Sequence, residues 1–461
     1  MLDRNLTNNF FQFFRFSSYD TSTEEGRSKE RYRLIGLAGS SSILAGISTS
    51  LLGLISVPLS VSYLGKEQFG LWMVLNSLVV WIQLSDCGMS NGLMNALAEA
   101  NGKRDQRAAC AYVTSSLVVL SLISLILLAC LFVSYRHFPW QKVLNISTPE
   151  NALIAGRCFL TLGFLFILNI PLSIVIKVFS AFQLAYIANL AQVISSVLSL
   201  IGLYVAIRFE LDLPSLVFIV TTGPLLGNLF LWLLLKRYLP WMRIRSQLLS
   251  IKALHRIAKS SIPLSLYQIG VLLINHAVNI VLAQVVGLTI VADYQILLRV
   301  YLLVFSVGTA VARPFYPALR EAFEGADNSW VSASIKKVLI LRVGLSTMLS
   351  LPLLFGGDWL VKTWVGQPLN ERFGFLGWLS LMTLVIFSSV SSTLSEILLI
   401  LDEIKSQIKI IFLSAVVTLG GIFYFVPTSG LIAVYVAMAV STFYPIFWCY
   451  HRLDRKLHTL R

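Results

Sequence analysis

Residues 108–134 read AACAYVTSSLVVLSLISLILLACLFVS, a run of 27 positions without a charged side chain. An α-helix needs about 20 apolar residues to cross the ~30 Å hydrocarbon core of a bilayer, so this run predicts a transmembrane helix. Eleven further runs are long and apolar enough to do the same, at 34–61, 69–93, 152–176, 184–207, 213–235, 260–286, 291–316, 335–356, 373–400, 407–426 and 430–450. The sequence therefore predicts an all-α integral membrane protein with about twelve transmembrane helices.

The composition agrees with this class. Of the 461 residues, 56% are hydrophobic and only 13% are charged, whereas soluble domains carry roughly 25% charged residues. The longest predicted outer connections, 135–151 and 357–372, leave no room for a catalytic domain. The chain has no Walker A, GxSxG, HExxH or CxxC motif, which are the signatures of common enzyme and metal sites. We therefore expect no enzymatic activity, no catalytic residues, no metal site and no cofactor.

The basic residues predict the orientation in the membrane. If the N-terminus is inside, the inner segments hold 27 Lys and Arg residues and the outer connections hold six. Such a bias is the positive-inside signal, and it predicts that both termini are cytoplasmic. The net charge of +14 is explained by these flanking residues, so nucleic acid is not an expected partner, whereas membrane lipid is.

The longest inner segment divides the chain into two halves. We expect a cytoplasmic tail at 1–33, a first six-helix bundle at 34–235, a basic cytoplasmic linker at 236–259, a second six-helix bundle at 260–450 and a cytoplasmic tail at 451–461. A faint internal repeat, with few matching positions, aligns Gly65 with Gly287. Repeated halves are common in transporters, where the substrate path runs between them.

Two adjacent predicted spans in the second half carry polar faces. Gln295, Arg299 and Arg313 lie on one face of the eighth span, and Gln268, Asn275 and Asn279 lie on one face of the seventh, beside His276. Ionisable residues within spans usually face the bundle interior, so these residues are candidates for a substrate path. The alternatives are that Arg299 extends to the membrane surface or neutralises Asp293, and that the amides only join helices.

The first half supplies further candidates. Asn76 and Asp86 lie on the second predicted span, and Asn189 lies on the fifth. Asp86 is either a helix cap or kink near the inner surface, or a counter-charge or coupling-ion ligand. For Arg342, which lies a few residues inside a span, we expect the side chain to extend to the membrane surface.

A family resemblance rests on two segments. PLSVSYLGKEQFGLW at 58–72, followed by DCGMSNG at 86–92, resembles the first two helices of bacterial polysaccharide flippases. These are the Wzx-type exporters of O-antigen and capsule repeat units, in the multidrug/oligosaccharidyl-lipid/polysaccharide (MOP) superfamily. The twelve-span layout and central basic loop resemble the family over about residues 34–450, although the motif covers only some 35 residues.

The resemblance implies two six-helix bundles around a V-shaped cavity, alternating access, and a location in a bacterial cytoplasmic (inner) membrane. It implies an undecaprenyl-pyrophosphate-linked oligosaccharide as substrate, and a polysaccharide polymerase and a chain-length regulator as further partners. Some relatives carry basic residues in their first two spans, but this sequence has none there. Arg299, with Arg313, would then have to supply positive charge for the pyrophosphate.

Two other functions remain open on the sequence alone. One is a secondary exporter of a small molecule, like the multidrug (MATE) exporters of the same superfamily, whose mostly cationic substrates disfavour an arginine-lined cavity. The other is a membrane scaffold for a polysaccharide assembly complex, which would tolerate changes to the polar faces. The major facilitator superfamily is a poorer match, because the segment 95–107 lacks its loop motif.

Overall fold

The computed structural model describes residues 24–86, 88–135, 137–146, 148–312, 315–325, 328–369, 373–401 and 403–458. It is helical throughout, without a strand in these ranges, as the sequence predicts. The helices are α2 (Glu24–Val80), α3 (Met89–Gly102), α4 (Gln106–Ser134), α5 (Trp140–Leu144), α6 (Pro149–Ala181), α7 (Ala185–Arg208), α8 (Leu213–Tyr238), α9 (Ile251–Val285), α10 (Leu288–Ala312), α11 (Phe315–Glu324), α12 (Asn328–Ser350), α13 (Leu353–Val365), α14 (Gly374–Ile400), α15 (Ile404–Ser429) and α16 (Leu431–His458), with 3-10 turns at Trp81–Asp86 and Ser246–Leu248.

Helix α2 contains the first predicted span and the start of the second. The chain reverses at Gly65, whose φ of 73° lies in the left-handed region that glycine adopts without strain. Before this residue, Tyr63 donates a hydrogen bond to the carbonyl of Leu211, in the connection that follows α7. After it the chain runs back, so that Gly92 packs against Ile257 near the start of α9.

The number of spans agrees with a chain reversal inside α2, at Gly65. Within the described residues, ten helices are long and apolar enough to span a membrane, or eleven if the bent pair 329–350 and 353–365 is one span. The first of them, Gly36–Asp86, has 51 residues and would be about 77 Å long if straight, more than twice the hydrocarbon thickness. Counting its two arms separately, and the bent pair as one, gives the twelve spans predicted.

Side-chain caps begin four of the helices. The side chains of Asp105, Thr148, Asp212 and Ser250 accept hydrogen bonds from backbone N–H groups in the first turns of α4, α6, α8 and α9. The first N–H groups of a helix have no partner within it, and lipid offers none. These residues therefore define where the spans can start.

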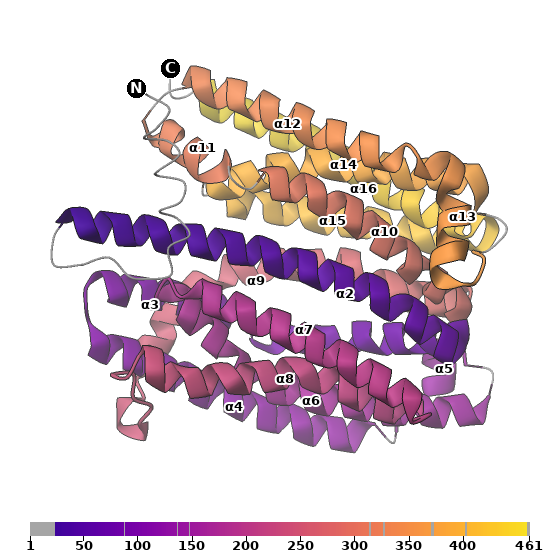
Figure 1. Cartoon of the computed structure of the whole chain (residues 1–461), viewed down its shortest axis with the longest axis horizontal. Helices are drawn as coiled ribbons and strands as arrows, with labels where there is room; N and C mark the ends of the chain where they lie inside the picture. The colour runs from indigo at the N-terminus through magenta and orange to yellow at the C-terminus, as the bar shows by residue number, and fades with distance from the viewer. Residues whose placement is uncertain are drawn as a thin grey trace.

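The helices form two layers with α2 and α9 between them, as Figure 1 shows. Helices α4, α6, α7 and α8 lie in one layer, and α10, α12, α14, α15 and α16 lie in the other. We call the end at which α2 begins and α16 ends the terminal end, and the opposite end the Gly65 end. Two separate hydrophobic clusters, around Leu97 and Leu398, form the cores of the two layers toward the terminal end.

The two layers share one core toward the Gly65 end. A single hydrophobic cluster there contains Val61 and Leu71 from the first half together with Val291 and Val365 from the second. The cores of the two layers are therefore joined at the Gly65 end and separate toward the terminal end, where α9 packs on the first half through Ile257. This is the V-shaped arrangement that the resemblance implies.

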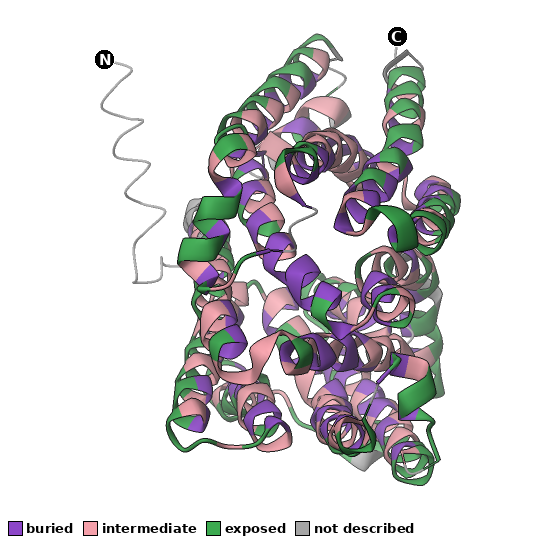
Figure 2. Ribbon diagram, turned by 90° about the vertical axis from the view of Figure 1, so that its right-hand side faces the viewer, coloured by how far each residue is buried: buried purple, intermediate pink, exposed green. Residues whose placement is uncertain are grey.

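The exposed surface is that of a membrane protein. In Figure 2 the exposed residues lie mostly on the outside of the helix assembly and the buried residues lie toward its interior. Large apolar side chains lie on the exposed faces, including Leu125, Val133 and Phe423, which are 63%, 70% and 67% exposed. Soluble proteins rarely expose apolar patches of this extent, so these faces are expected to contact lipid.

The helices extend into the predicted linker and tails. Helix α8 continues to Tyr238 and α9 begins at Ile251, so residues 239–250 connect the halves. Helix α2 starts at Glu24 and α16 continues to His458, within the stretches expected as tails. Gly287, which the faint repeat aligns with Gly65, also has a positive φ, 119°, and follows the first helix of its half. The two glycines therefore make equivalent turns.

Candidate functional site

A cavity of about 600 Å³ lies between the two halves, and we call it the central cavity. Its volume is within the usual range for ligand sites. Its first wall comes from the first half and its second wall from α9 and the ends of α14 and α15. The lining residues are Leu84, Asp86, Ser90, Asn91, Phe166, Asn169, Ile170, Ser173, Lys177, Tyr267, Gln268, Val271, Leu272, Leu399 and Ile404.

A break between α2 and α3 places Asp86 at this cavity. The helix gives way to a 3-10 turn at Trp81–Asp86, and Gly88 adopts a φ of 70° before α3 begins. Asp86 Oδ1 accepts a hydrogen bond from the Gly88 N–H at 2.7 Å. A Cβ on Gly88 would lie 2.0 Å from Ser265 Oγ of α9, so only glycine permits this close approach. Asp86 thus stabilises the break and also faces the cavity.

Lys177 provides positive charge at the central cavity. It lies on α6, four residues after Ser173 and eight after Asn169, so the three side chains share one helix face. Its Nζ donates a hydrogen bond to Asn91 Oδ1 at 2.9 Å, and the residue is half-buried. An ammonium has three donors, so this contact leaves capacity for an anionic ligand.

The two halves are held together at the Gly65 end by polar contacts. Lys66 Nζ lies 2.6 Å from Asp293 Oδ1 and 2.8 Å from the carbonyl of Pro368. Trp364 Nε1 donates to the carbonyl of Leu54 at 2.9 Å. Each contact joins the first half to the second, so the Gly65 end is closed in this conformation.

Two of the predicted path residues belong to this closed end. Asn279 is 2% exposed and donates to Ser77 Oγ at 2.7 Å, while its own side-chain oxygen accepts from Gln295 Nε2 at 2.9 Å. The amides of α9 and α10 therefore connect helices across the halves in this conformation. The expectation that they line a substrate path stays a prediction.

Two smaller cavities adjoin the central one. A cavity of about 250 Å³ within the second half shares Tyr267 with it and is lined by the predicted residue Asn275. A cavity of about 360 Å³ within the first half shares Asn169 and Ser173 with it and is lined by Asn189. Asn189 also donates to Ser41 Oγ of α2 at 2.9 Å.

The remaining predicted residues lie elsewhere. Of the ten, the structure places Asp86 and Gln268 at the central cavity. Arg299 is half-buried on α10 beside Gly53 of α2, with Nη1 3.4 Å from where a Cβ on that glycine would lie. Asp293 pairs with Lys66, not with Arg299. His276 and Asn76 are half-buried and line none of these three cavities, and Arg313 lies outside the described residues.

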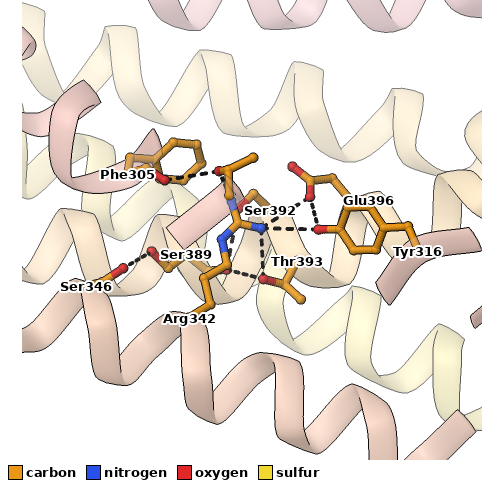
Figure 3. Close-up of polar contacts among 9 residues, drawn as sticks. Phe305, Tyr316, Arg342, Ser346, Ser389, Ser392, Thr393 and Glu396 are labelled. Atoms are coloured by element: carbon orange, nitrogen blue, oxygen red, sulfur yellow. Dashed lines mark hydrogen bonds and ion pairs between the residues drawn. The ribbon is translucent and has the colours of Figure 1, made fainter. Parts of the chain in front are cut away.

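Arg342 forms a buried network within the second half, shown in Figure 3, so the expectation that it reaches the membrane surface is wrong. Its side chain is 1% exposed and lies 3.2 Å from Glu396 Oε2. Nη2 donates to Thr309 Oγ1 at 2.7 Å, and the guanidinium lies over the ring of Phe305, 5.0 Å from its centroid. Tyr316 donates to the same carboxylate oxygen of Glu396. A buried charge costs less free energy when it is paired and hydrogen-bonded, which explains the inward direction.

A second ionic contact joins the halves at the terminal end. Glu99 of α3 lies 2.5 Å from Arg256 of α9 and 2.7 Å from Lys103. Hydrogen bonds from Lys103 and Arg256, and their charges, lower the pKa of Glu99 to about 2. These side chains are exposed, so water screens the interaction and its contribution to stability is small.

Lys177 is not among the predicted site residues, because the predicted span 152–176 ends one residue before it. The signal was the spacing of Asn169, Ser173 and Lys177, which places three polar side chains on one helix face. Lys66 was assigned to an outer connection, and nothing in the sequence pairs it with Asp293, 227 positions away. Within the described residues, no group of three or more His, Cys, Asp or Glu side chains is arranged to hold a metal ion.

The model of the family described as "Polysaccharide biosynthesis protein" matches residues 38–323. A Salmonella typhi protein named for O-antigen transport is 22% identical over 413 residues, covering 88% of this chain and 91% of its own length.

Two solved structures show the same fold. An inward-facing multidrug resistance MATE family transporter of the MOP superfamily superposes with a TM-score of 0.76 at 16% identity, covering 90% of this chain and 99% of that one. The lipid II flippase MurJ, in an inward closed conformation, superposes with a TM-score of 0.69 at 14% identity, covering 90% of this chain and 89% of that one.

Proposed function

The chain belongs to the polysaccharide biosynthesis protein family and has the MOP-superfamily fold, and on that premise we propose that it is a lipid-linked oligosaccharide flippase. It moves undecaprenyl-pyrophosphate-linked polysaccharide repeat units from the cytoplasmic to the outer leaflet by alternating access. The relative named for O-antigen transport and the lipid II flippase neighbour support this substrate class.

The central cavity is the observation that carries the proposal. It is bounded by both halves and lies away from the closed Gly65 end. One lysine, one aspartate and several neutral amides and hydroxyls line it among apolar side chains. A pyrophosphate requires positive charge and hydrogen-bond donors, and a sugar chain requires neutral polar partners. The polyprenyl tail needs neither, so it remains among the lipids while the head group crosses.

Two basic residues are proposed to contact the pyrophosphate. Lys177 lines the central cavity, and among the residues that the structure describes its Nζ hydrogen-bonds only to Asn91, which supports this role. Arg299 is proposed for a later stage of the movement. No described residue hydrogen-bonds to it or forms an ion pair with it, and a guanidinium inside a membrane is costly without a partner. Its planar donors suit phosphate oxygens.

Alternation between two conformations is supported by the asymmetry of the polar contacts. Opening the Gly65 end requires the Lys66–Asp293 pair and the Asn279–Ser77 hydrogen bond to break. Closing the terminal end requires the separate cores of the two layers to approach each other. The protein would deliver its cargo to the side on which the Gly65 end lies.

We propose that the terminal end is cytoplasmic, since the basic residues gather there. Residue 245 lies in the connection between the halves and is exposed. A single cysteine at this position should react with an impermeant thiol reagent only after the membrane is opened. Reaction in intact cells would reverse the orientation, and with it the direction of transport. The polymerase and chain-length regulator that would use the delivered units are proposed partners on the outer side.

Depletion of the protein tests the function in cells. Lipid-linked repeat units should accumulate and should be hidden from a membrane-impermeant lectin applied to spheroplasts. An unchanged lectin-accessible pool would favour export of a small molecule instead. Normal delivery with Lys177→Gln and also with Arg299→Gln, together with loss of delivery on depletion, would favour a scaffold. The matched control is Lys142→Gln, which changes an exposed lysine near the Gly65 end.

A further inference from the structure

The cavity within the second half differs in chemistry from the central cavity. Five helices line it: α9, α10, α14, α15 and α16. Not one of its lining residues is Asp, Glu, Lys or Arg, whereas the central cavity contains Asp86 and Lys177. We call it the serine cavity, because Ser388, Ser391, Ser392, Ser395, Ser414 and Ser441 line it together with Thr442.

Hydrogen-bonding capacity remains unused inside the serine cavity. Gln407 is 3% exposed, and its Nε2 donates to the carbonyl of Ser395 at 3.2 Å, while its Oε1 accepts no hydrogen bond from any described residue. Ser391 lines the same space and makes no hydrogen bond to a described residue. Both groups line the cavity, so each can hydrogen-bond to a ligand or to water there.

Aromatic rings form part of the wall. Tyr301 and Phe305 stack one turn apart on α10, with centroids 5.6 Å apart and planes at 16°. Phe305 is held in turn by the guanidinium of Arg342 (Figure 3). The Arg342 network therefore fixes an aromatic surface beside the serine hydroxyls, while its charges stay outside the cavity lining.

We infer that the serine cavity is a binding site for a neutral sugar ring of the cargo. Hydroxyls, amides and flat aromatic faces together match the edges and faces of a sugar ring. The absence of lining charges disfavours a phosphate or an ammonium, because a buried ion without a counter-ion is costly. The volume of about 250 Å³ admits a single ring. Tyr267, which lines both cavities, marks the point where the glycan would pass from the central cavity.

This inference rests on the proposed function and divides the cargo between two sites. The pyrophosphate would stay in the central cavity near Lys177, and a sugar ring would enter the serine cavity. The two sites can then be tested separately with two partial ligands. One is undecaprenyl pyrophosphate without sugar, and the other is the oligosaccharide released by mild acid from the source organism's lipid-linked repeat units.

The test uses the full-length protein in lipid nanodiscs and measures binding of each probe. Ser391→Leu and Thr442→Leu narrow the serine cavity from two different helices. Each should weaken oligosaccharide binding by about tenfold or more, the loss expected for one or two hydrogen bonds. Neither should change binding of undecaprenyl pyrophosphate. Thr383→Leu is the control on α14, since Thr383 bonds only to its own helix at Leu379 and lines neither cavity.

The outcomes separate the two proposals. Wild-type protein that binds neither probe would argue against the flippase function itself. Wild-type protein that binds both, with Ser391→Leu and Thr442→Leu retaining full oligosaccharide affinity, would overturn the sugar site alone. A thermal melt of each variant identifies any that is misfolded, in which case the other variant decides. Oligosaccharide binding that Thr383→Leu weakens equally would also refute the site.

Discussion

Replacing Asp293 by Asn should open the Gly65 end of the protein. The carboxylate lies 2.6 Å from Lys66 Nζ, and the two side chains are 6% and 20% exposed. A hydrogen bond to a charged group contributes about 1.5–3 kcal/mol. Since about 1.4 kcal/mol is a factor of ten, the ratio of closed to open molecules should fall about 10- to 150-fold. The carbonyl of Pro368 still accepts from Lys66, which favours the lower part of this range.

The assay is a distance measurement between spin labels on opposite halves. Phe209 and Tyr424 lie near the Gly65 end and are 73% and 75% exposed, so labelled cysteines there should not disturb packing. The five native cysteines are replaced first. Pulsed electron resonance in nanodiscs should then show one short distance in the parent protein and an added longer distance in Asp293→Asn.

Asp358→Asn provides the matched control, because Asp358 accepts from Trp378 Nε1 within the second half. That variant should keep the parent distance. Exchange of the charges, with Lys66→Asp and Asp293→Lys together, should restore the short distance in part. An unchanged distribution in Asp293→Asn, or an equal shift in Asp358→Asn, would refute the idea that this ion pair holds the halves together.

Four further predictions concern single residues. Lys177→Gln should reduce surface polysaccharide about tenfold or more at matched protein levels, whereas Lys177→Arg should keep most of it; equal export by both would remove the lysine from the mechanism. Arg299→Lys should keep partial export and Arg299→Gln should lose most, and full export by the latter would exclude the residue. Arg342→Met should destabilise the second half by about 3 kcal/mol. This is the low end of the cost of breaking a buried ion pair, because Glu396 is partly exposed. An unchanged melting temperature would contradict this prediction. Glu99→Gln should lower the melting temperature by the same amount at every pH from roughly 5 to 8. The pKa of Glu99 is lowered to about 2, so its ionic contacts are lost only as the pH falls toward that value. A change in melting temperature that fades within this range would refute the lowered pKa.

The arrangement of spans was predictable from sequence because lipid imposes a simple rule. Every backbone group in the membrane must be satisfied within its own helix, so apolar length alone locates the spans. The faint repeat aligned Gly65 with Gly287, and the structure shows a positive φ at both positions. The break at Trp81–Asp86 was less visible, because a 3-10 turn and a close approach to α9 depend on a partner helix far along the chain.

The candidate site was predictable only in part. Gln268 and Asp86 follow the polar helix faces and do line the central cavity. Asn279 and Gln295 have the same spacing, yet they bond to each other in the closed end, and no rule of periodicity separates these two roles. Arg342 points inward because Glu396, Thr309 and Thr393 surround it. Such partners are brought together by tertiary packing, which a single sequence does not reveal.

The most direct test of the flippase function is transport by the purified protein. Liposomes containing the full chain and a fluorescent undecaprenyl-pyrophosphate oligosaccharide are treated with an impermeant quencher, which reports the fraction in the outer leaflet. Lys177→Gln should slow the exchange of lipid between leaflets about tenfold or more, while Lys142→Gln should not. The flippase function predicts that the wild-type protein exchanges the lipid between leaflets. Exchange no faster than in protein-free liposomes, with the protein folded by its melting curve and with any required ion gradient imposed in either direction, would contradict it.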